Sequence, residues 1–216
     1  FAGLNLGAHV GDAPARVEAN RARLQQVAGI PGTLNWLNQV HGIAVHPVSD
    51  RYERVPDADA ACAHEAGQAC IVMTADCLPV LFCDRAGTVV AAAHAGWRGL
   101  QGGVLEASIA AMGCEPGEIL AWLGPAIGPA AFEVGGEVRD AFMAEQAEAA
   151  TAFVSSLNEG KWLADIYQLA RLRLARAGVT AIYGGEYCTF SDSEQFYSYR
   201  RNGQTGRMAS IIWLAE

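Results

Sequence analysis

The sequence predicts a mixed α/β or α+β protein in which strands and helices are interleaved. Short apolar runs of strand length alternate with segments whose apolar residues recur at helical spacing. The connections between them have both hairpin and crossover lengths, which is typical of mixed sheets flanked by helices. A chain of 216 residues suits one domain with its own core, so we expect residues 1–216 to form a single domain.

Four segments show the periodicity and the end signals of helices. The first is residues 11–29, in which Asp12 is a candidate cap, Pro14 suits the first turn and Gly29 ends the helix. The other three helices are expected at residues 99–113, 138–150 and 164–178. Glycines at positions 113 and 178 end two of these.

Apolar runs of strand length lie between the helices. We expect strands at residues 33–40, 43–48, 68–76, 79–84, 88–95, 179–185 and 208–216. A further strand begins at residue 118 and breaks into a loop rich in glycine and proline that reaches residue 129. Periodicity does not decide which of these strands pair.

The charge balance excludes two classes of partner. The net charge is −8, and proteins that bind nucleic acid or anionic membranes usually present a basic face, so we expect neither partner. No apolar run reaches the ~18 residues of a membrane span, and no signal peptide is visible after Phe1. Because the chain begins with Phe rather than Met, we expect a short N-terminal segment to precede it.

The six cysteines indicate a reducing compartment. The chain is not small and carries no secretion signal, which argues against a disulfide framework. It has no CxxC pair, which argues against a zinc ribbon or a thioredoxin-type site. We therefore expect the protein in the cytoplasm, with most of its thiols buried as small apolar side chains.

Three possible metal ligands stand at the ends of predicted strands. His41 follows one strand, Cys77 follows a second and His94 ends a third. Side chains at strand ends commonly face a ligand pocket. Two histidines and one cysteine complete the protein ligand set of a catalytic zinc that keeps an open fourth position.

Two other chemistries use the same side chains. In the first, Cys77 is a thiolate nucleophile, His94 is its base, and Asp76 or Asn38 orients the histidine. In the second, the two histidines and the cysteine hold copper, with Met73 as a weak axial ligand. A multicopper oxidase also needs a trinuclear centre built mostly from imidazoles, and five histidines are too few for both centres.

Two further stretches indicate an anion or a polar ligand. Arg98 lies between two glycines just before a predicted helix, where free N–H groups, the helix dipole and a guanidinium favour a phosphate or carboxylate. A tight turn with a solvated arginine is the alternative. The glycine-rich loop at 124–135 carries Glu133 as a candidate acid or base. In the C-terminal run YRRNGQTGR, the arginines fit a solvated turn at least as well as an anion site: Arg200, Arg201 and Arg207.

Six ordered motifs give the chain a specific resemblance to a known family. LNLGAHVGD, NQVHG, TADCLPVLF, AAHAGWRG, GPAIGPAAFEVG and FYSYRRNGQTGRMAS resemble, in this order, the motifs of the laccase-domain family. Its members were first described as multicopper polyphenol oxidoreductases and later as purine nucleoside phosphorylases with adenosine deaminase activity. The resemblance covers nearly the whole chain.

The resemblance implies a fold, a metal and an activity. The fold is α+β, with mixed β-sheets flanked by helices, similar to the catalytic domain of deamidating necrotizing toxins. Zinc is held by the residues that correspond to His41, Cys77 and His94. Family members convert adenosine, inosine, guanosine and methylthioadenosine to free base and ribose 1-phosphate, and deaminate adenosine. Where many members carry a cysteine pair, this chain has Ala130 and Ala131, so these positions are not essential ligands.

The residue types suit that chemistry. Arg98 suits phosphate, and an activated water for deamination requires a proton shuttle, for which Asp76 and Glu133 are the candidates. Three aromatic residues are candidates for stacking on the base: Trp97, Phe132 and Tyr197.

We therefore expect a zinc enzyme that takes a purine nucleoside and phosphate. The residues expected to act in catalysis are Cys77, His94, Asp76 and Arg98. A metal-free cysteine hydrolase of amides or esters and a copper-dependent polyphenol oxidase are the alternatives.

Overall fold

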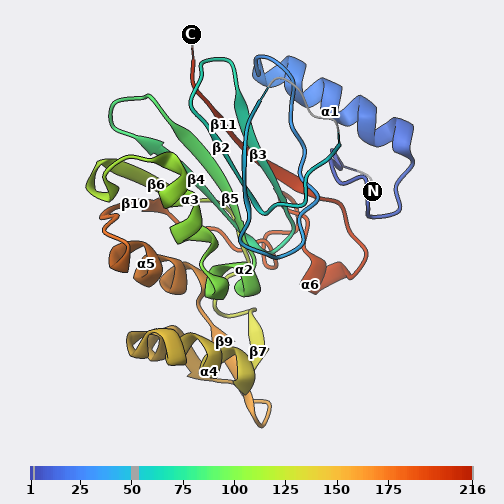
Figure 1. Ribbon diagram of the computed structural model, residues 1–216. Coiled ribbons are helices and arrows are strands. Elements are labelled where there is room, and N and C mark those ends of the chain that lie inside the picture. The colour runs from blue at the N-terminus through green and yellow to red at the C-terminus, as the bar shows by residue number, and fades with distance from the viewer. Residues whose placement is uncertain (2, 50–53, 216) are drawn as a thin grey trace.

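The computed structural model describes residues 1, 3–49 and 54–215, and its centre is a six-stranded mixed sheet (Figure 1). In spatial order the strands are β1 (Val45–Pro47), β2 (Ala60–Ala63), β5 (Val90–Ala95), β4 (Leu78–Asp84), β6 (Ile119–Leu123) and β10 (Ala181–Gly184). The outermost pairs are parallel and the three inner pairs are antiparallel. The predicted α+β class with mixed sheets is confirmed.

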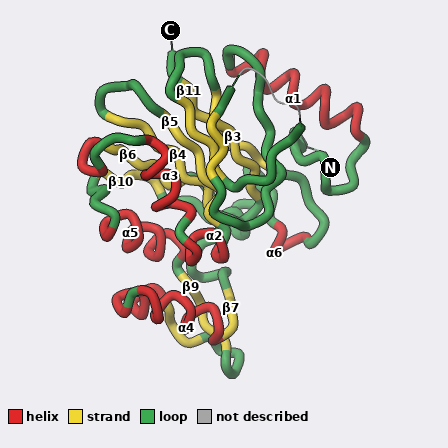
Figure 2. Tube along the Cα trace, in the orientation of Figure 1, coloured by secondary structure: helices red, strands yellow, loops and turns green. Residues whose placement is uncertain are grey.

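Helices cover one face of this sheet, and a pair of strands covers the other (Figure 2). The helices are α3 (Val104–Met112) and α5 (Ile166–Arg176). The strands are β3 (Ala69–Thr74) and β11 (Met208–Trp213), which pair antiparallel. α1 (Pro14–Ala28) lies beyond this pair. The layers explain the unbroken apolar run of β3, because its alternate residues face two different apolar clusters.

The central strand β5 consists of small residues up to its carboxyl end. All six of its residues are buried. Ala91, Ala93 and Ala95 belong to the cluster under the helices, whereas Ala92 belongs to the cluster under β3 and β11. Side chains of this size allow both layers to pack closely on the strand. By the same alternation His94 lies on the face of Ala92.

A smaller unit extends from one end of the sheet and lies at the bottom of Figure 1. It is a three-stranded antiparallel sheet of β7 (Glu133–Gly135), β9 (Lys161–Ala164) and β8 (Phe153–Ser155), with α4 (Gly136–Glu145) beside it. β9 leads directly into α5, so this unit is joined to the main sheet through the glycine-rich loop and α5.

Several predicted elements differ from the structure. Residues 33–40 form no strand and make only an isolated bridge from Asn38 to Asp57, because polar side chains here bond to other segments: Asn38 donates to Asp57, and Gln39 donates to the carbonyl oxygen of Met73 in β3. The helix expected at 99–113 is two helices, α2 (Trp97–Gly102) and α3, since Gly103 between them has a φ of 104°. The helix expected at 138–150 stops at Glu145 and a 3-10 helix follows (Ala147–Ala152).

Four strands were not predicted at all. β2 is a run of small residues, and β7, β8 and β9 have three or four residues each, too few to show a period. The last residue of the final predicted strand, Glu216, lies outside the described residues. Within the described part of the chain, no helix has both the length and the apolarity needed to cross a bilayer.

Candidate metal site and its cavity

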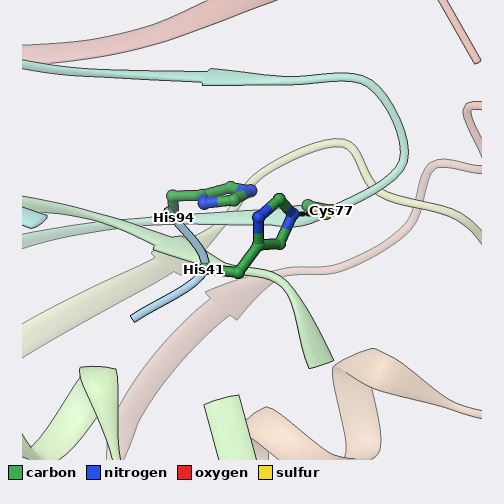
Figure 3. Close-up of side chains that lie close together, drawn as sticks. All are labelled: His41, Cys77 and His94. Carbon is green, nitrogen blue, oxygen red and sulfur yellow. Dashed lines mark hydrogen bonds between the residues drawn. The ribbon is translucent and has the colours of Figure 1, made fainter. Parts of the chain in front are cut away.

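The structure brings His41, Cys77 and His94 together, as the sequence predicts (Figure 3). Their nearest donor atoms all lie within 4.8 Å of one another, and Cys77 Sγ is 3.9 Å from His41 Nε2. The two imidazole rings meet edge to face, with centroids 4.9 Å apart. His94 is buried, Cys77 half-buried and His41 exposed, so the cluster is reached from one side.

The register of the strands on both sides of β5 places Cys77 and Asp59 beside His94. Leu78, the first residue of β4, pairs with Ala95, so Cys77 lies next to the carboxyl end of β5. On the other side of β5, Ala60 pairs with Ala93, and the backbone N–H of His94 donates to the carbonyl oxygen of Asp59 at 2.7 Å. The sheet therefore places Cys77 and Asp59 on opposite sides of His94.

Asp59 is the residue of this site that sequence reasoning missed. One carboxylate oxygen accepts from His94 Nδ1 at 2.8 Å and from the backbone N–H of His41 at 2.9 Å. The other accepts from the backbone N–H groups of Gly42 and Val40. The carboxylate thus holds His94 in one tautomer, with Nε2 left for a ligand, and supports His41, whose φ is 62°. The only sequence signal was an aspartate directly before a run of small apolar residues.

Two glycines of the motif AHAGWRG allow the cluster to form. A Cβ at Gly96 would lie 2.9 Å from His41 Cδ2 and 3.1 Å from Cys77 Sγ. A Cβ at Gly99 would lie 2.8 Å from the carbonyl oxygen of Gly42. The 2.9 Å and 2.8 Å distances are shorter than side chains tolerate, so these glycines let the start of α2 pack directly on the loop that carries His41.

The electrostatics of the cluster favour a charged thiolate. Burial by itself raises the pKa of the Cys77 thiol, but the charge of His94 and hydrogen bonds from His41 and His94 outweigh it and lower the pKa to about 6. Burial likewise opposes the charged form of His94, but the Cys77 thiolate and the Asp59 carboxylate raise its pKa to about 9. A thiolate is the form in which cysteine binds a metal.

The donor set fits a zinc ion. Four-coordinate zinc takes thiolate sulfur and imidazole nitrogen, and its ligand atoms lie roughly 3.5 Å apart. The donors here are close to that spacing, they include a stabilised thiolate, and His94 is supported by a carboxylate in the manner usual for metal-bound histidine. These three residues can therefore hold a metal and leave a position open toward solvent.

A cavity of about 530 Å³ opens beside the cluster. Its apolar wall includes Ile127, Phe132 and Ile166, and Trp97 lines it as well. The basic side chains on its wall, apart from the two histidines of the cluster, are His9, Arg98, Arg200 and Arg207. Volume and lining suit a ligand with one flat apolar part and one anionic part.

Two other predicted site residues, Arg98 and Asp76, line the cavity outside the histidine–cysteine–histidine cluster. Arg98 lines the cavity from an exposed position and stacks on Trp97, 4.3 Å from the ring centroid. Asp76 also lines the cavity, but its carboxylate accepts from Thr189 Oγ1, Ser198 Oγ and the backbone N–H of Arg200. These bonds connect the turn after β3 to Thr189 and Ser198 and to α6 (Tyr199–Asn202), which contains Arg200.

Three candidate residues lie away from the cavity. Glu133 accepts hydrogen bonds from Ser156 and Asn158 in the smaller unit. Tyr197 lines a separate hollow near the N-terminus. Asn38 donates to Asp57 and therefore orients no catalytic histidine.

Fold and site together define a class: an α+β protein with a histidine–cysteine–histidine metal site at the wall of a cationic cavity. The sequence model of the family described as multi-copper polyphenol oxidoreductase laccase matches residues 1–215. This chain belongs to that family. The resemblance found in the six motifs is confirmed.

Curated relatives in this family are described as phosphorylases. The chain is 59% identical to a purine nucleoside phosphorylase of Pseudomonas aeruginosa, over all of this chain and 88% of that protein. It is 58% identical to the purine nucleoside phosphorylase YfiH of Escherichia coli, over 98% of this chain and 86% of that one.

Solved structures share the fold. The crystal structure of the Neisseria meningitidis protein NMB0706 matches with a TM-score of 0.95 and 56% identity. The match covers all of this chain and 88% of the Neisseria chain. The crystal structure of YlmD from Geobacillus stearothermophilus has a TM-score of 0.93 and 34% identity, with coverage of 100% and 86%.

Proposed function

We propose that this chain is a zinc-dependent purine nucleoside phosphorylase that also deaminates adenosine. The observation that carries the proposal is the His41, Cys77 and His94 cluster at the wall of a cavity that both apolar and cationic side chains line. The names of the relatives at 58–59% identity support the same activity. Adenosine, inosine, guanosine and methylthioadenosine are the proposed substrates, and the cytoplasm the proposed compartment.

In this proposal the chain's side chains divide the work of binding. Trp97 and Phe132 offer ring faces to the purine base. Arg98, extended over Trp97, contributes positive charge for the phosphate that attacks C1′ of the ribose. His41, Cys77 and His94 would hold the zinc ion, which would supply Lewis acidity toward a bound water or a substrate oxygen.

Asp76 has a positioning role in this proposal. All three donors that reach its carboxylate come from residues 189–200, and Arg200 of this segment lines the cavity. The carboxylate therefore holds part of the cavity wall in place, and the sequence-based idea of Asp76 as a proton shuttle has less support from its contacts.

The test is incubation of the purified chain with adenosine and phosphate, followed by chromatography. We expect adenine and ribose 1-phosphate from phosphorolysis and inosine or hypoxanthine from deamination. If protein with bound zinc yields neither base nor inosine, the proposal is wrong.

A second candidate has its own observation. Cys77, His94 and Asp59 form a chain of thiol, imidazole and carboxylate, which is the arrangement of a cysteine hydrolase of amides or esters. This alternative predicts activity that survives chelation and does not require His41.

The copper alternative has less support. Within the described part of the chain, His41, Cys77 and His94 are the only grouping of three or more potential ligands. The sulfur of Met73, the proposed axial ligand, accepts a hydrogen bond from Arg21. Dioxygen uptake by the purified protein in the presence of a phenol would support the copper-dependent oxidase.

A further inference from the structure

Basic side chains outnumber carboxylates on the described part of the cavity wall. Among the described residues, the ion pairs involve neither Arg98, Arg200, Arg207 nor His9. Asp76 supplies the only carboxylate that the described residues place on this wall, and its charge and that of the Cys77 thiolate act on Arg207. An anionic ligand would supply the missing charge.

Arg207 is half-buried, and several contacts fix its position. Its Nη1 donates to the carbonyl oxygens of Thr205 at 2.9 Å and Gly206 at 3.1 Å. Its backbone N–H donates to Asn5 Oδ1, and its stem packs so closely on Gly7 that a Cβ there would lie 2.7 Å from Arg207 Cγ. Nε and Nη2 have no acceptor among the described residues, so two donors of the guanidinium stay available.

His9 stands beside Arg207. The N-terminal loop and the segment before β11 lie side by side, since the backbone N–H of Leu6 donates to the carbonyl oxygen of Arg207 (Figure 1). Burial, the charge of Arg207 and the charge of Arg21 together lower the pKa of His9. Three basic groups therefore lie close together, and an anion between them would relieve their repulsion.

The other two arginines lie at the rim of the cavity. Arg200 is exposed, and its Nη1 donates to the carbonyl oxygens of Ala131 and Glu133. Arg98 is exposed and lies on Trp97. Arg207 differs from both in burial: it is half-buried, and hydrogen bonds from a partly desolvated guanidinium to an anion are stronger than those from an exposed one.

We propose that Arg207, with His9 beside it, forms the binding site for inorganic phosphate in this cavity. The inference rests on the proposed phosphorylase function and names the residues that hold its second substrate. Nε and Nη2 of Arg207 donate to the phosphate as a fork, and His9 donates a third hydrogen bond. Arg98 then approaches the same anion from the rim. The sequence left open whether the motif YRRNGQTGR is a solvated turn or an anion site. In this proposal its Arg207 binds the ligand. Its Arg201 has a structural role, because it donates to three carbonyl oxygens of the preceding loop.

The experiment is a calorimetric titration of the full chain with inorganic phosphate, without nucleoside. We expect Arg207→Gln to weaken phosphate binding about tenfold or more, because two charge-assisted hydrogen bonds are lost. Arg85→Gln is the matched control: it removes the same charge from an exposed site at the other end of β4 from Cys77, so phosphate affinity should change less than about twofold. A folded Arg207→Gln protein with unchanged phosphate affinity overturns the proposal.

A second variant covers the case in which Arg207→Gln does not fold. His9 is exposed, and its side chain makes no hydrogen bond within the described residues, so His9→Gln should keep the fold. We expect His9→Gln to weaken phosphate binding several-fold. In wild-type protein, phosphate should also raise the pKa of His9 measured by NMR. Phosphate that binds without moving the His9 signal contradicts the assignment.

The design separates this inference from the proposed function. Phosphate binding at Arg207 without phosphorolysis would reject the activity and keep the site. Phosphorolysis with an Arg207→Gln protein whose KM for phosphate is unchanged would reject the site and keep the activity. A parallel titration with adenosine monophosphate tests the other source of the same anion: if Arg207→Gln weakens only the nucleotide, the site does not serve inorganic phosphate.

Discussion

At the scale of single residues, Asp59 connects the parts of the candidate metal site. It is fully buried, and its oxygens accept from the His94 ring and from three consecutive backbone N–H groups around His41. A metal-binding histidine depends on such a partner for its tautomer and for the direction of its free nitrogen. Asp59 is therefore a positioning residue for both imidazoles.

We expect Asp59→Asn to weaken zinc binding roughly 10–100-fold, measured by competition with a chromogenic chelator. The matched control is Asp84→Asn, since Asp84 is also buried and accepts from the backbone of Thr88 and Val89 at the far end of β4. That change should lower the free energy of unfolding by about 1–3 kcal/mol without altering zinc affinity. Equal zinc affinity in both variants would contradict the role of Asp59.

Gly96 makes the cluster sensitive to a single added methyl group. The φ of Gly96 is −59°, so alanine causes no backbone strain, and the cost of Gly96→Ala arises from contact with His41 and Cys77. We expect a loss of zinc affinity of about tenfold or more, with a near-normal melting temperature. Gly117→Ala, where a Cβ meets nothing within 4 Å, is the control. Unchanged affinity in Gly96→Ala would show that the loop moves aside.

The thiol of Cys77 should be unusually reactive in metal-free protein. Its pKa is about 6, so the thiolate predominates above pH 6 and the neutral thiol predominates below pH 6. We expect alkylation of Cys77 by iodoacetamide, followed by mass spectrometry, to be half-maximal near pH 6. Burial raises the pKa of Cys62 to about 11, which makes this residue an internal control. Zinc should protect Cys77, and alkylation that begins only near pH 8–9 would contradict this electrostatic picture.

The three ligands, but not their support, could be predicted from the sequence. His41, Cys77 and His94 each follow an apolar run and stand among glycines and polar residues, a pattern visible within ten residues. Asp59 lies 35 positions from His94 and meets it only because β2 and β5 pair. Contacts made by strand register leave no local mark in a sequence, and the same holds for the bonds between Asp76 and residues 189–200.

At the scale of elements, the cavity wall is held by the turn after β3. Asp76 has a φ of 87° and accepts from Ser198 and Thr189, and its carbonyl oxygen accepts from Ile127. This one residue therefore connects three segments that line the cavity. The arrangement predicts that the segment carrying α6 loosens when the carboxylate is altered.

We expect Asp76→Asn to speed hydrogen exchange at the Arg200 amide more than tenfold. The side-chain NH2 group of asparagine is a donor, and it would face the hydroxyl and N–H groups that donate to the Asp76 carboxylate. In the same segment, the carboxylate of Asp192 accepts from Gln195, so Asp192→Asn should leave the exchange rate of the Arg200 amide unchanged. If the Arg200 amide exchanges alike in both variants, the segment is held by other contacts.

Long elements could be predicted, and short or interrupted ones could not. α1 and α5 have 15 and 11 residues with clear ends, and β3, β4 and β5 are unbroken apolar runs. The break between α2 and α3 depends on a positive φ at Gly103, which its neighbour Gly102 does not share. Composition alone gives no reason to prefer one of two adjacent glycines.

At the scale of the whole molecule, the layered fold gathers distant segments around one cavity. His9, His41, Cys77, His94 and Arg207 come, in this order, from the N-terminal loop, the loop before β1, the residue before β4, strand β5 and the segment before β11. The chain has a net charge of −8, yet arginine and histidine line this cavity, so its wall is more basic than the chain as a whole. Metal site and cationic wall face the same space.

The central claim is that one metal ion, held by His41, Cys77 and His94, is needed for phosphorolysis in that space. The most direct measurement is the rate of ribose 1-phosphate release from inosine while zinc is returned stepwise to chelated protein. We expect the rate to rise in proportion to bound zinc, to level off at one ion per chain, and to stay at background in Cys77→Ser. Full activity in zinc-free protein, or no activity at one zinc per chain, would contradict the claim.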